Sequence, residues 1–310
     1  MPTFAMLFPG QGSQYIGMLS SFFYSDNIFQ NTFDEASHII GINLLNLIKK
    51  NSPKEINKNQ YIQVIILTAS VAIYRYWKKK CGKMPELMSG HSLGEYSALV
   101  CANSIKFSDA VKIVFLRGLL MQKITINRPS SMYSIHGLDE KIIEKICSIS
   151  SYDKIVSLSC INSNDQIIIS GDQKAVEIAC VYCKKKGAKS IFKLNINIPA
   201  HCELMKPICT RFTKILKNIP IYKPMIPVIN NVDMKSETID INIKNALIKQ
   251  LYSPVRWKSI IDLILSKNIF FMLEIGPNKI LTNLNKKNKK ITALHTDTLN
   301  DFIISFQQIN

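Results

Sequence analysis

The chain has 310 residues, of which 47% are hydrophobic, so it can bury the core of one large domain or of a domain with an insertion. It lacks a run of roughly 18 consecutive apolar residues, so we expect no membrane-spanning helix. The net charge of +17 invites a nucleic-acid hypothesis, yet only five of the 39 basic residues are arginine and the lysines are dispersed. We therefore expect a solvated lysine surface that attracts acidic partners, and no nucleic acid.

Location and redox state follow from two further features. No basic segment precedes the apolar stretch near the start and no small-residue cleavage site follows it, so we expect a cytoplasmic protein without a signal peptide. The eight cysteines should then be reduced thiols. Cys180 and Cys183 form a C-x-x-C, but no second such pair follows and both lie in a helical pattern, so we expect no metal there.

The first part of the chain alternates strand-like and helix-like segments, which indicates a parallel sheet covered by helices. Residues 4–8 predict a first strand that runs into a glycine-rich loop at 9–14. Residues 61–77 predict a long buried helix, and residues 84–89 predict a short strand. A helix with an apolar face is expected at 95–102.

Between that short strand and that helix lies Gly90-His91-Ser92-Leu93-Gly94, a G-x-S-x-G nucleophile elbow in its usual context. The tight turn pushes the serine Oγ out of the sheet, and the glycines let chain segments approach without Cβ clashes. The N-terminus of the helix offers N–H groups and a partial positive charge to a developing oxyanion. We predict Ser92 as a nucleophile, in preference to a serine that only caps the helix.

A further helix is predicted at 107–122, with Ser108 as its N-cap and Arg117 in its second half. The character of the sequence changes near residue 128. The segments that follow are a strand, a helix, two strands, a helix and a strand, at 131–136, 139–148, 155–162, 166–170, 173–186 and 190–194. This β-α-β-β-α-β order is the ferredoxin-like signature.

The fold class that we predict is α/β: an α/β-hydrolase-like large domain with a parallel sheet and an inserted ferredoxin-like subdomain. The large domain comprises residues 1–127 and 197–310, and the subdomain comprises residues 128–196. After the insertion we expect a helix at 203–217 and a late strand at 272–276.

A serine hydroxyl needs a base to take its proton, and histidine is the first candidate. The five histidines of the chain are His38, His91, His136, His201 and His295. Taken alone, any of them is more often structural or exposed than catalytic. The elbow should point His91 away from its neighbour Ser92. His201 follows Ser92 in the chain order of hydrolase triads and lies in a loop before a helix, which favours it as the base.

Six segments carry a wider pattern, namely Gly10-Gln11-Gly12-Ser13, residues 90–96, Phe115-Leu116-Arg117-Gly118, and residues 198–202, 250–257 and 274–278. In this order, over nearly the whole chain, they resemble the malonyl-CoA:acyl carrier protein transacylase family of bacterial fatty acid synthesis. The resemblance implies ping-pong transfer from malonyl-CoA to the phosphopantetheine thiol of an acidic acyl carrier protein. It implies neither a bound cofactor nor a metal, and we expect a monomer.

The resemblance also implies roles for single residues. Ser92 is the nucleophile and His201 is its base. A backbone carbonyl near Gln250 orients the imidazole, and Asp233 ranks below it as the orienting group.

Further positions line the site. The backbone N–H of Leu93 supplies one oxyanion-hole donor, which follows from the elbow geometry itself. By resemblance Gln11, between two glycines, helps to form the same hole, and Gln63 and Asn162 line the substrate site. Gln63 is explained equally well as a polar residue on a mostly buried helix.

Arg117 decides the class of substrate. A buried arginine without a partner costs several kcal/mol, so Arg117 needs one. A malonyl carboxylate would supply a bidentate partner, and an intramolecular pair with Glu95 or another acid is the alternative. With the family pattern we favour the substrate carboxylate, and we expect acyl groups without a carboxylate to be rejected.

Three positions or segments depart from the family pattern. Residues 128–133 lack the usual glycines, Cys160 replaces an asparagine, and Asn278 replaces a glycine, which asparagine tolerates at a positive φ. These changes put contacts of the subdomain in doubt and leave the chemical centre intact. Two other functions are a serine hydrolase or thioesterase, which would not need Arg117, and a non-catalytic module that binds a carrier protein.

Overall fold

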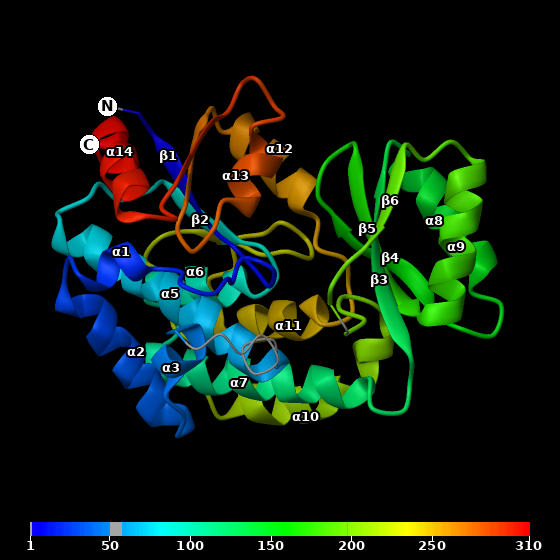
Figure 1. The fold of residues 1–310 in the computed structure, drawn as a ribbon, viewed down its shortest axis with the longest axis horizontal. Coiled ribbons are helices and arrows are strands. Elements are labelled where there is room, and N and C mark those ends of the chain that lie inside the picture. Colours follow the sequence, from blue (N-terminus) through cyan, green and yellow to red (C-terminus); the bar gives the residue numbers. More distant parts are fainter. Residues whose placement is uncertain (1, 50–57, 197) are drawn as a thin grey trace.

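The computed structural model describes residues 2–49, 58–196 and 198–310, and it shows a two-part α/β architecture (Figure 1). The larger part contains the parallel strands β1 (Phe4–Phe8), β2 (Leu87–Gly90), β7 (Val228–Ile229), β8 (Phe271–Glu274) and β9 (Thr292–His295). They form one sheet in the order β7-β2-β1-β8-β9. Strand β1 is central and all of its residues are buried, which explains its continuous apolar sequence. The predicted parallel sheet is confirmed.

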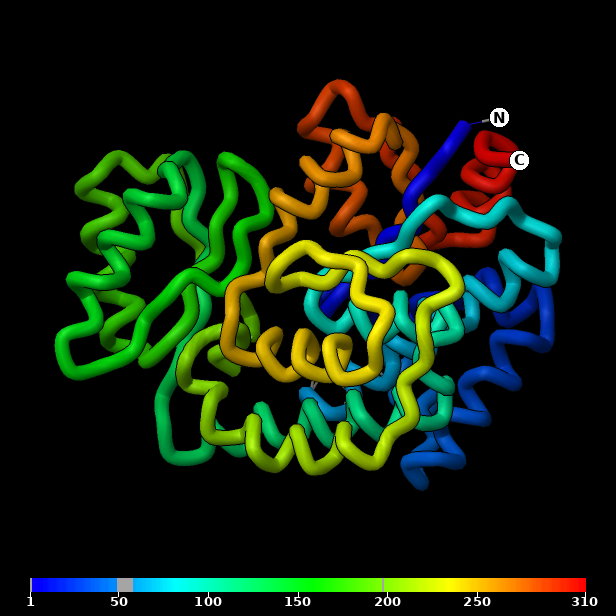
Figure 2. The backbone as a smooth tube through the Cα atoms, turned by 180° about the vertical axis from the view of Figure 1, so that it is seen from behind, coloured from blue at the N-terminus to red at the C-terminus, as the bar shows by residue number. Residues whose placement is uncertain are grey.

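Helices surround this sheet (Figures 1 and 2). They are α1 (Ser20–Phe23), α2 (Asn27–Ile40), α3 (Leu44–Lys49), α5 (Asn59–Lys79), α6 (Gly94–Cys101), α7 (Phe107–Ile124), α10 (Lys206–Lys217), α11 (Asp240–Gln250), α12 (Trp257–Ser266), α13 (Ile280–Asn285) and α14 (Leu299–Ile309), with a short 3-10 helix η1 (Glu203–Met205) before α10. Helix α5 is the predicted long buried helix, and it packs against α2, α6 and α7.

A glycine allows α7 to lie unusually close to α5. A Cβ on Gly118 would lie 2.5 Å from the Cα of Gln60, so only glycine fits this crossing. The Nδ2 of Asn59 donates to the Gly118 carbonyl across the same contact at 2.9 Å. This close approach places the neighbouring Arg117 beside Gln63 of α5.

The smaller part comprises β3 (Ser130–His136), α8 (Glu140–Ser150), β4 (Val156–Ile161), β5 (Gln166–Asp172), α9 (Gln173–Lys185) and β6 (Ser190–Lys193). Its antiparallel sheet has the strand order β4-β5-β3-β6, and α8 and α9 cover the outer face (Figure 1). A separate apolar core fills the space between sheet and helices. The predicted β-α-β-β-α-β order is confirmed, while the domain boundaries at 128 and 196 stay a prediction.

The other face of this small sheet meets the larger part. Met132, Cys160 and Ile168 belong to the core of the large domain rather than to that of the subdomain. In addition, the Ile161 N–H at the end of β4 donates to the Val255 carbonyl at 2.9 Å, so a backbone hydrogen bond joins this strand to the large domain. A cavity at this junction is therefore lined by both parts of the molecule.

Two details of the sequence prediction can be judged here. Ser108 was expected as the N-cap of its helix, but this is wrong, because α7 begins at Phe107 and the extended Lys106 is the N-cap without a side-chain bond. Asp109 in the first turn supplies a negative charge near the positive helix end instead. Asn278 has a φ of 66°, the left-handed conformation that asparagine tolerates.

The surface agrees with the expected lysine pattern. The lysine runs at 78–80, 184–186 and 286–290 are exposed at helix ends or in loops. All eight cysteines are free thiols. Within the described ranges, no helix combines the length and the apolar character that crossing a membrane requires.

The two elbow glycines generate a prediction about stability. A Cβ on Gly90 would overlap the Gly94 carbonyl, and a Cβ on Gly94 would overlap the Phe8 carbonyl. Because backbone atoms cannot move aside as a flexible side chain can, Gly90→Ala or Gly94→Ala should lower the free energy of unfolding by about 3 kcal/mol or more. Denaturant unfolding measures this. The control is Gly187→Ala, where φ is 91° and the space is open, so the cost should be about 1–2 kcal/mol. Equal losses at all three positions would contradict the prediction.

Candidate active site

The elbow holds Ser92 in a strained conformation. Strand β2 ends at Gly90, α6 begins at Gly94, and Ser92 between them has a φ of 52°, in the left-handed region. The Ser92 N–H donates to Oδ1 of Asn231 at 2.7 Å. The Ser92 carbonyl accepts from Nε2 of Gln250 at 2.9 Å. Two buried side chains from distant segments therefore hold both backbone polar groups of the strained residue.

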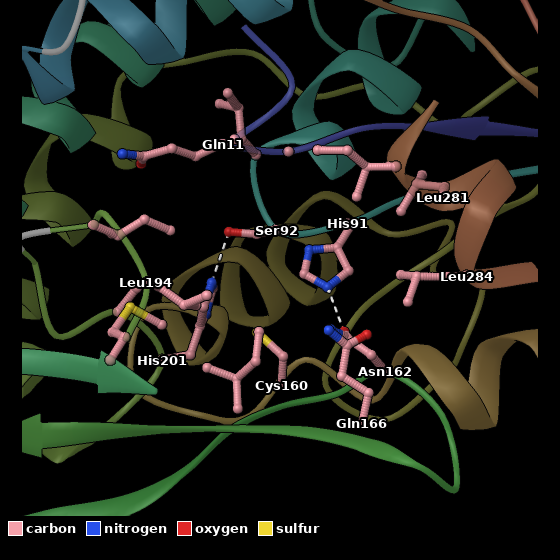
Figure 3. A pocket seen from close by; sticks show the side chains of 18 of the residues that line it. Gln11, His91, Ser92, Cys160, Asn162, Gln166, Leu194, His201, Leu281 and Leu284 are labelled. Carbon is pink, nitrogen blue, oxygen red and sulfur yellow. Dashed lines mark hydrogen bonds between the residues drawn. The ribbon is translucent and has the colours of Figure 1, made fainter. Parts of the chain in front are cut away.

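The structure brings Ser92 and His201 together. Ser92 Oγ lies 2.7 Å from His201 Nε2 (Figure 3). On the other side of the ring, Nδ1 lies 2.6 Å from the backbone carbonyl of Gln250. A carbonyl only accepts hydrogen bonds, so Nδ1 carries the proton and Nε2 is free to accept one from Ser92. Gln250 rather than Asp233 thus occupies the orienting position.

The imidazole of His201 is kept neutral by its surroundings. Only 3% of the residue is exposed. Burial, followed by the nearby charge of Arg117, lowers the pKa of His201 to about 3. A neutral imidazole with a bare Nε2 is the form that can take a proton from a serine hydroxyl.

Arg117 extends from α7 to the nucleophile. Its Nη2 lies 3.3 Å from Ser92 Oγ and 3.1 Å from Oε1 of Gln250. Its Nη1 donates to Oε1 of Gln63 at 2.9 Å, and its guanidinium lies over the ring of Tyr96. Its Nε is buried and has no partner within the described chain. Burial lowers the pKa of Arg117 from its usual value.

The alternative of a direct pair between Arg117 and Glu95 is wrong. Among the described residues no carboxylate forms an ion pair with Arg117, and Glu95 reaches it only through Gln250. The Gln250 Nε2 donates to Glu95 Oε2 at 2.8 Å while its Oε1 accepts from Arg117. The guanidinium is therefore held by amides, and its charge is left for another anion.

Gln63 and Asn162 differ in their relation to the cavity. Gln63 is buried behind Arg117 and supports the guanidinium, and it is not part of the cavity wall. Asn162 lines the cavity, and its Oδ1 lies 3.0 Å from His91 Nε2 (Figure 3). His91 points away from Ser92, as expected, but it still lines the same cavity. Burial lowers the pKa of His91.

Two residues that line the cavity near the nucleophile have backbone amides with no acceptor among the described residues. Gln11 and Leu93 both line it, and in Figure 3 Gln11 and His201 lie on opposite sides of Ser92. The Gln11 amide has no acceptor in the described chain, and Leu93 is the N-cap residue of α6, where helical N–H groups lack internal partners. Both can donate to an oxygen bound beside Ser92.

The cavity itself is about 480 Å³ in volume. Its walls are mainly apolar, with Met132 and Ile168 from the subdomain sheet and Leu281 and Leu284 from α13. Among residues 2–49, 58–196 and 198–310, no group of three His, Cys, Asp or Glu side chains could hold a metal ion. The polar groups around Ser92 are joined in the wall by Gln166, Asn283 and Lys287, and a mixed wall of this kind suits an acyl group on a longer arm.

Sequence reasoning missed Asn231 and treated Glu95 only as a rival partner of Arg117. Both are fully or nearly fully buried and contact the elbow or its supports. One sequence signal could have found Asn231: it follows a short apolar strand, and sites in parallel sheets gather at the carboxyl ends of strands.

The fold and the site together define an acyl transferase domain, and the family model described as "Acyl transferase domain" matches residues 5–296. A protein of Buchnera aphidicola subsp. Schizaphis graminum, named malonyl CoA-acyl carrier protein transacylase, is 60% identical over 311 aligned residues, which cover 100% of both chains. The chain belongs to the malonyl CoA-acyl carrier protein transacylase family.

Two solved structures are similar over almost their whole length. The malonyl CoA-acyl carrier protein transacylase of Coxiella burnetii has a TM-score of 0.97 and 38% identity, covering 99% of this chain and 98% of that one. A malonyl-transacylase in complex with its type II polyketide synthase acyl-carrier protein has a TM-score of 0.97 and 42% identity, covering 99% of each chain. The two-part fold expected from the sequence is the fold of these enzymes.

The low pKa of His201 predicts a flat pH profile. The imidazole can accept a proton wherever the pH is well above 3, so the rate of Ser92 acylation in a single turnover should stay level from about pH 5 to pH 8. Rapid-quench mass spectrometry measures this rate. Burial raises the pKa of Glu95 to about 7, so the series is repeated with Glu95→Gln to remove that titration. A fall in rate centred near 6.5, the usual histidine value, that persists in Glu95→Gln would contradict the prediction.

Proposed function

We propose that this chain transfers the malonyl group of malonyl-CoA to the phosphopantetheine thiol of an acyl carrier protein, through a malonyl ester on Ser92. The observation that carries the proposal is the position of Arg117, a buried guanidinium that lies 3.3 Å from Ser92 Oγ and is held by amides. The carboxylate of a malonyl ester on Ser92 would lie one methylene beyond the ester carbonyl, within reach of that guanidinium. The names of the similar proteins support the same activity.

The first half-reaction forms the ester. Ser92 Oγ attacks the thioester carbon of malonyl-CoA while His201 Nε2 takes the hydroxyl proton. The N–H groups of Gln11 and Leu93 stabilise the oxyanion of the tetrahedral intermediate. The carbon–sulfur bond then breaks, the coenzyme A thiolate takes the proton from His201, and a malonyl-serine ester remains.

The second half-reaction runs the same steps with the carrier thiol. His201 takes the proton of the phosphopantetheine thiol, and the thiolate attacks the ester carbonyl. The bond to Ser92 Oγ breaks, His201 returns the proton to that oxygen, and malonyl-carrier protein leaves. Every proton and electron pair is accounted for without a bound cofactor or metal.

The surface around the cavity supports an acidic carrier as partner. Lys287 lines the cavity and belongs to the exposed lysine run at 286–290. Positive potential at this opening would attract the phosphates of coenzyme A and acidic side chains of a carrier. A structurally similar malonyl-transacylase is described in complex with its acyl-carrier protein, which supports this partner.

We further propose that the chain acts as a monomer in the cytoplasm. All polar groups that the proposed reaction uses come from one chain. The eight free thiols suit a reducing compartment.

The decisive experiment compares malonyl-CoA with acetyl-CoA by intact-mass spectrometry. Wild type should form a malonyl adduct that moves to added acyl carrier protein, whereas Ser92→Ala should form none. Arg117→Ala should lower the acylation efficiency with malonyl-CoA by about 100-fold or more, because a charge-assisted contact to the carboxylate is lost. With acetyl-CoA the same variant should lose far less, since acetyl has no carboxylate and only the contacts of Arg117 to protein groups, including Ser92 and Gln250, are removed.

The control is Arg211→Ala, since Arg211 is exposed on α10 and should leave the preference for malonyl unchanged. Rapid release of free malonate without transfer to the carrier would instead support a hydrolase. An absence of both adduct and turnover in wild type would support a binding module.

A further inference from the structure

Three buried polar side chains form a network beneath the elbow. Glu95 lies in the first turn of α6, Asn231 lies two residues beyond the end of β7, and Gln250 is the last residue of α11. Their exposed fractions are 2%, 0% and 0%. The proposed reaction uses only the backbone carbonyl of Gln250, so these three side chains have no role in it so far.

The amide of Asn231 bridges two backbone groups of the elbow. Its Oδ1 accepts from the Ser92 N–H at 2.7 Å, and its Nδ2 donates to the Gly90 carbonyl at 2.7 Å. One planar side chain therefore fixes the chain immediately before and at the strained residue. A left-handed serine is unfavourable by about 1–3 kcal/mol and persists only where its surroundings hold it.

The carboxylate of Glu95 in turn holds Asn231 and Gln250. Its Oε2 accepts from the Asn231 backbone N–H at 3.0 Å and from the Gln250 Nε2 at 2.8 Å. Hydrogen bonds to a carboxylate are stronger than those between neutral groups. The first bond fixes the loop that carries the Asn231 side chain. The second fixes the Gln250 amide with its Nε2 toward Ser92 and its Oε1 toward Arg117.

We propose that Asn231 is a positioning residue that clamps the Ser92 elbow in its left-handed conformation, and that Glu95 holds this clamp in place. The inference rests on the proposed function, because it concerns the aim of Ser92 Oγ at His201 and at the thioester. Asn231 does not touch the substrate arm, since it is not part of the cavity wall. A misplacement of about 1 Å at a reacting atom costs roughly 100-fold in rate.

The test is Asn231→Ala, examined by single-turnover acylation with malonyl-CoA. The maximal acylation rate should fall by about 30- to 100-fold, while the half-saturating malonyl-CoA concentration changes less than about threefold, because Arg117 keeps its contacts to Gln63 and Gln250. If this variant does not fold, Asn231→Ser replaces it, since the serine side chain is shorter by one bond and its hydroxyl cannot reach both the Gly90 carbonyl and the Ser92 amide. The same loss of rate is expected.

The matched control is Asn230→Ala. Asn230 is a buried asparagine in the same loop, but its Oδ1 accepts only from its own loop, at the N–H groups of Val232 and Asp233. It should lower the melting temperature as Asn231→Ala does, yet keep acylation within about threefold of wild type. Equal rate losses in both variants, or a wild-type rate in Asn231→Ala, would overturn the proposal.

A second pair of variants tests the part played by Glu95. Glu95→Gln keeps an oxygen that can accept both hydrogen bonds and should retain at least about ten times the acylation rate of Glu95→Ala. Equal rates in the two variants would overturn the role of Glu95. A wild-type chain that forms no malonyl-serine would instead refute the proposed function, so the two failures are distinguishable.

Discussion

The left-handed backbone of Ser92 is the constraint on which the rest of the site depends. A serine adopts this conformation at a cost, so the surrounding structure must hold it there. The close packing at Gly90 and Gly94 sets the path of the chain, and Asn231 and Gln250 take its polar groups. Segments that are far apart in the sequence must therefore meet at the end of β2 before the hydroxyl can face His201.

Buried charge is the second determinant of the site. Arg117 lies among amides and an aromatic ring, and the nearest supporting carboxylate, Glu95, reaches it only through the Gln250 amide. Its positive charge is thus stabilised without being neutralised by a direct partner. The same charge, together with burial, lowers the pKa of His201, so that the base stays unprotonated beside the nucleophile. One guanidinium therefore prepares both the recognition of a carboxylate and the state of the base.

Much of this site could be predicted from local sequence patterns. The remainder depends on contacts between segments that are distant in the sequence. The elbow was predictable because its glycines, strand and helix are contiguous, and the subdomain was predictable from the order of its periodic segments. Chain order favoured His201 as the base. The role of the Gln250 carbonyl in orienting the imidazole rested on family resemblance alone, because every residue has a backbone carbonyl and no residue type indicates its use. Asn231 contacts Ser92 across 139 positions of the chain. Its place after a short strand indicates which edge of the sheet it occupies, but no local pattern indicates which residue it contacts there. The prediction of Ser108 as an N-cap was wrong. The preference of serine for capping positions does not by itself fix the residue at which a packed helix begins.

The weak basicity of His201 has a consequence for the direction of the reaction. An imidazole that holds a proton loosely releases it readily to whichever sulfur has just left the acyl carbon. On the proposed mechanism both half-reactions exchange the same kinds of bond, a thioester and a serine ester, so neither is driven by the protein. The relative concentrations of acylated and free coenzyme A and carrier protein in the cell would then decide the direction of acyl transfer. The chain would only bring the two pools to equilibrium.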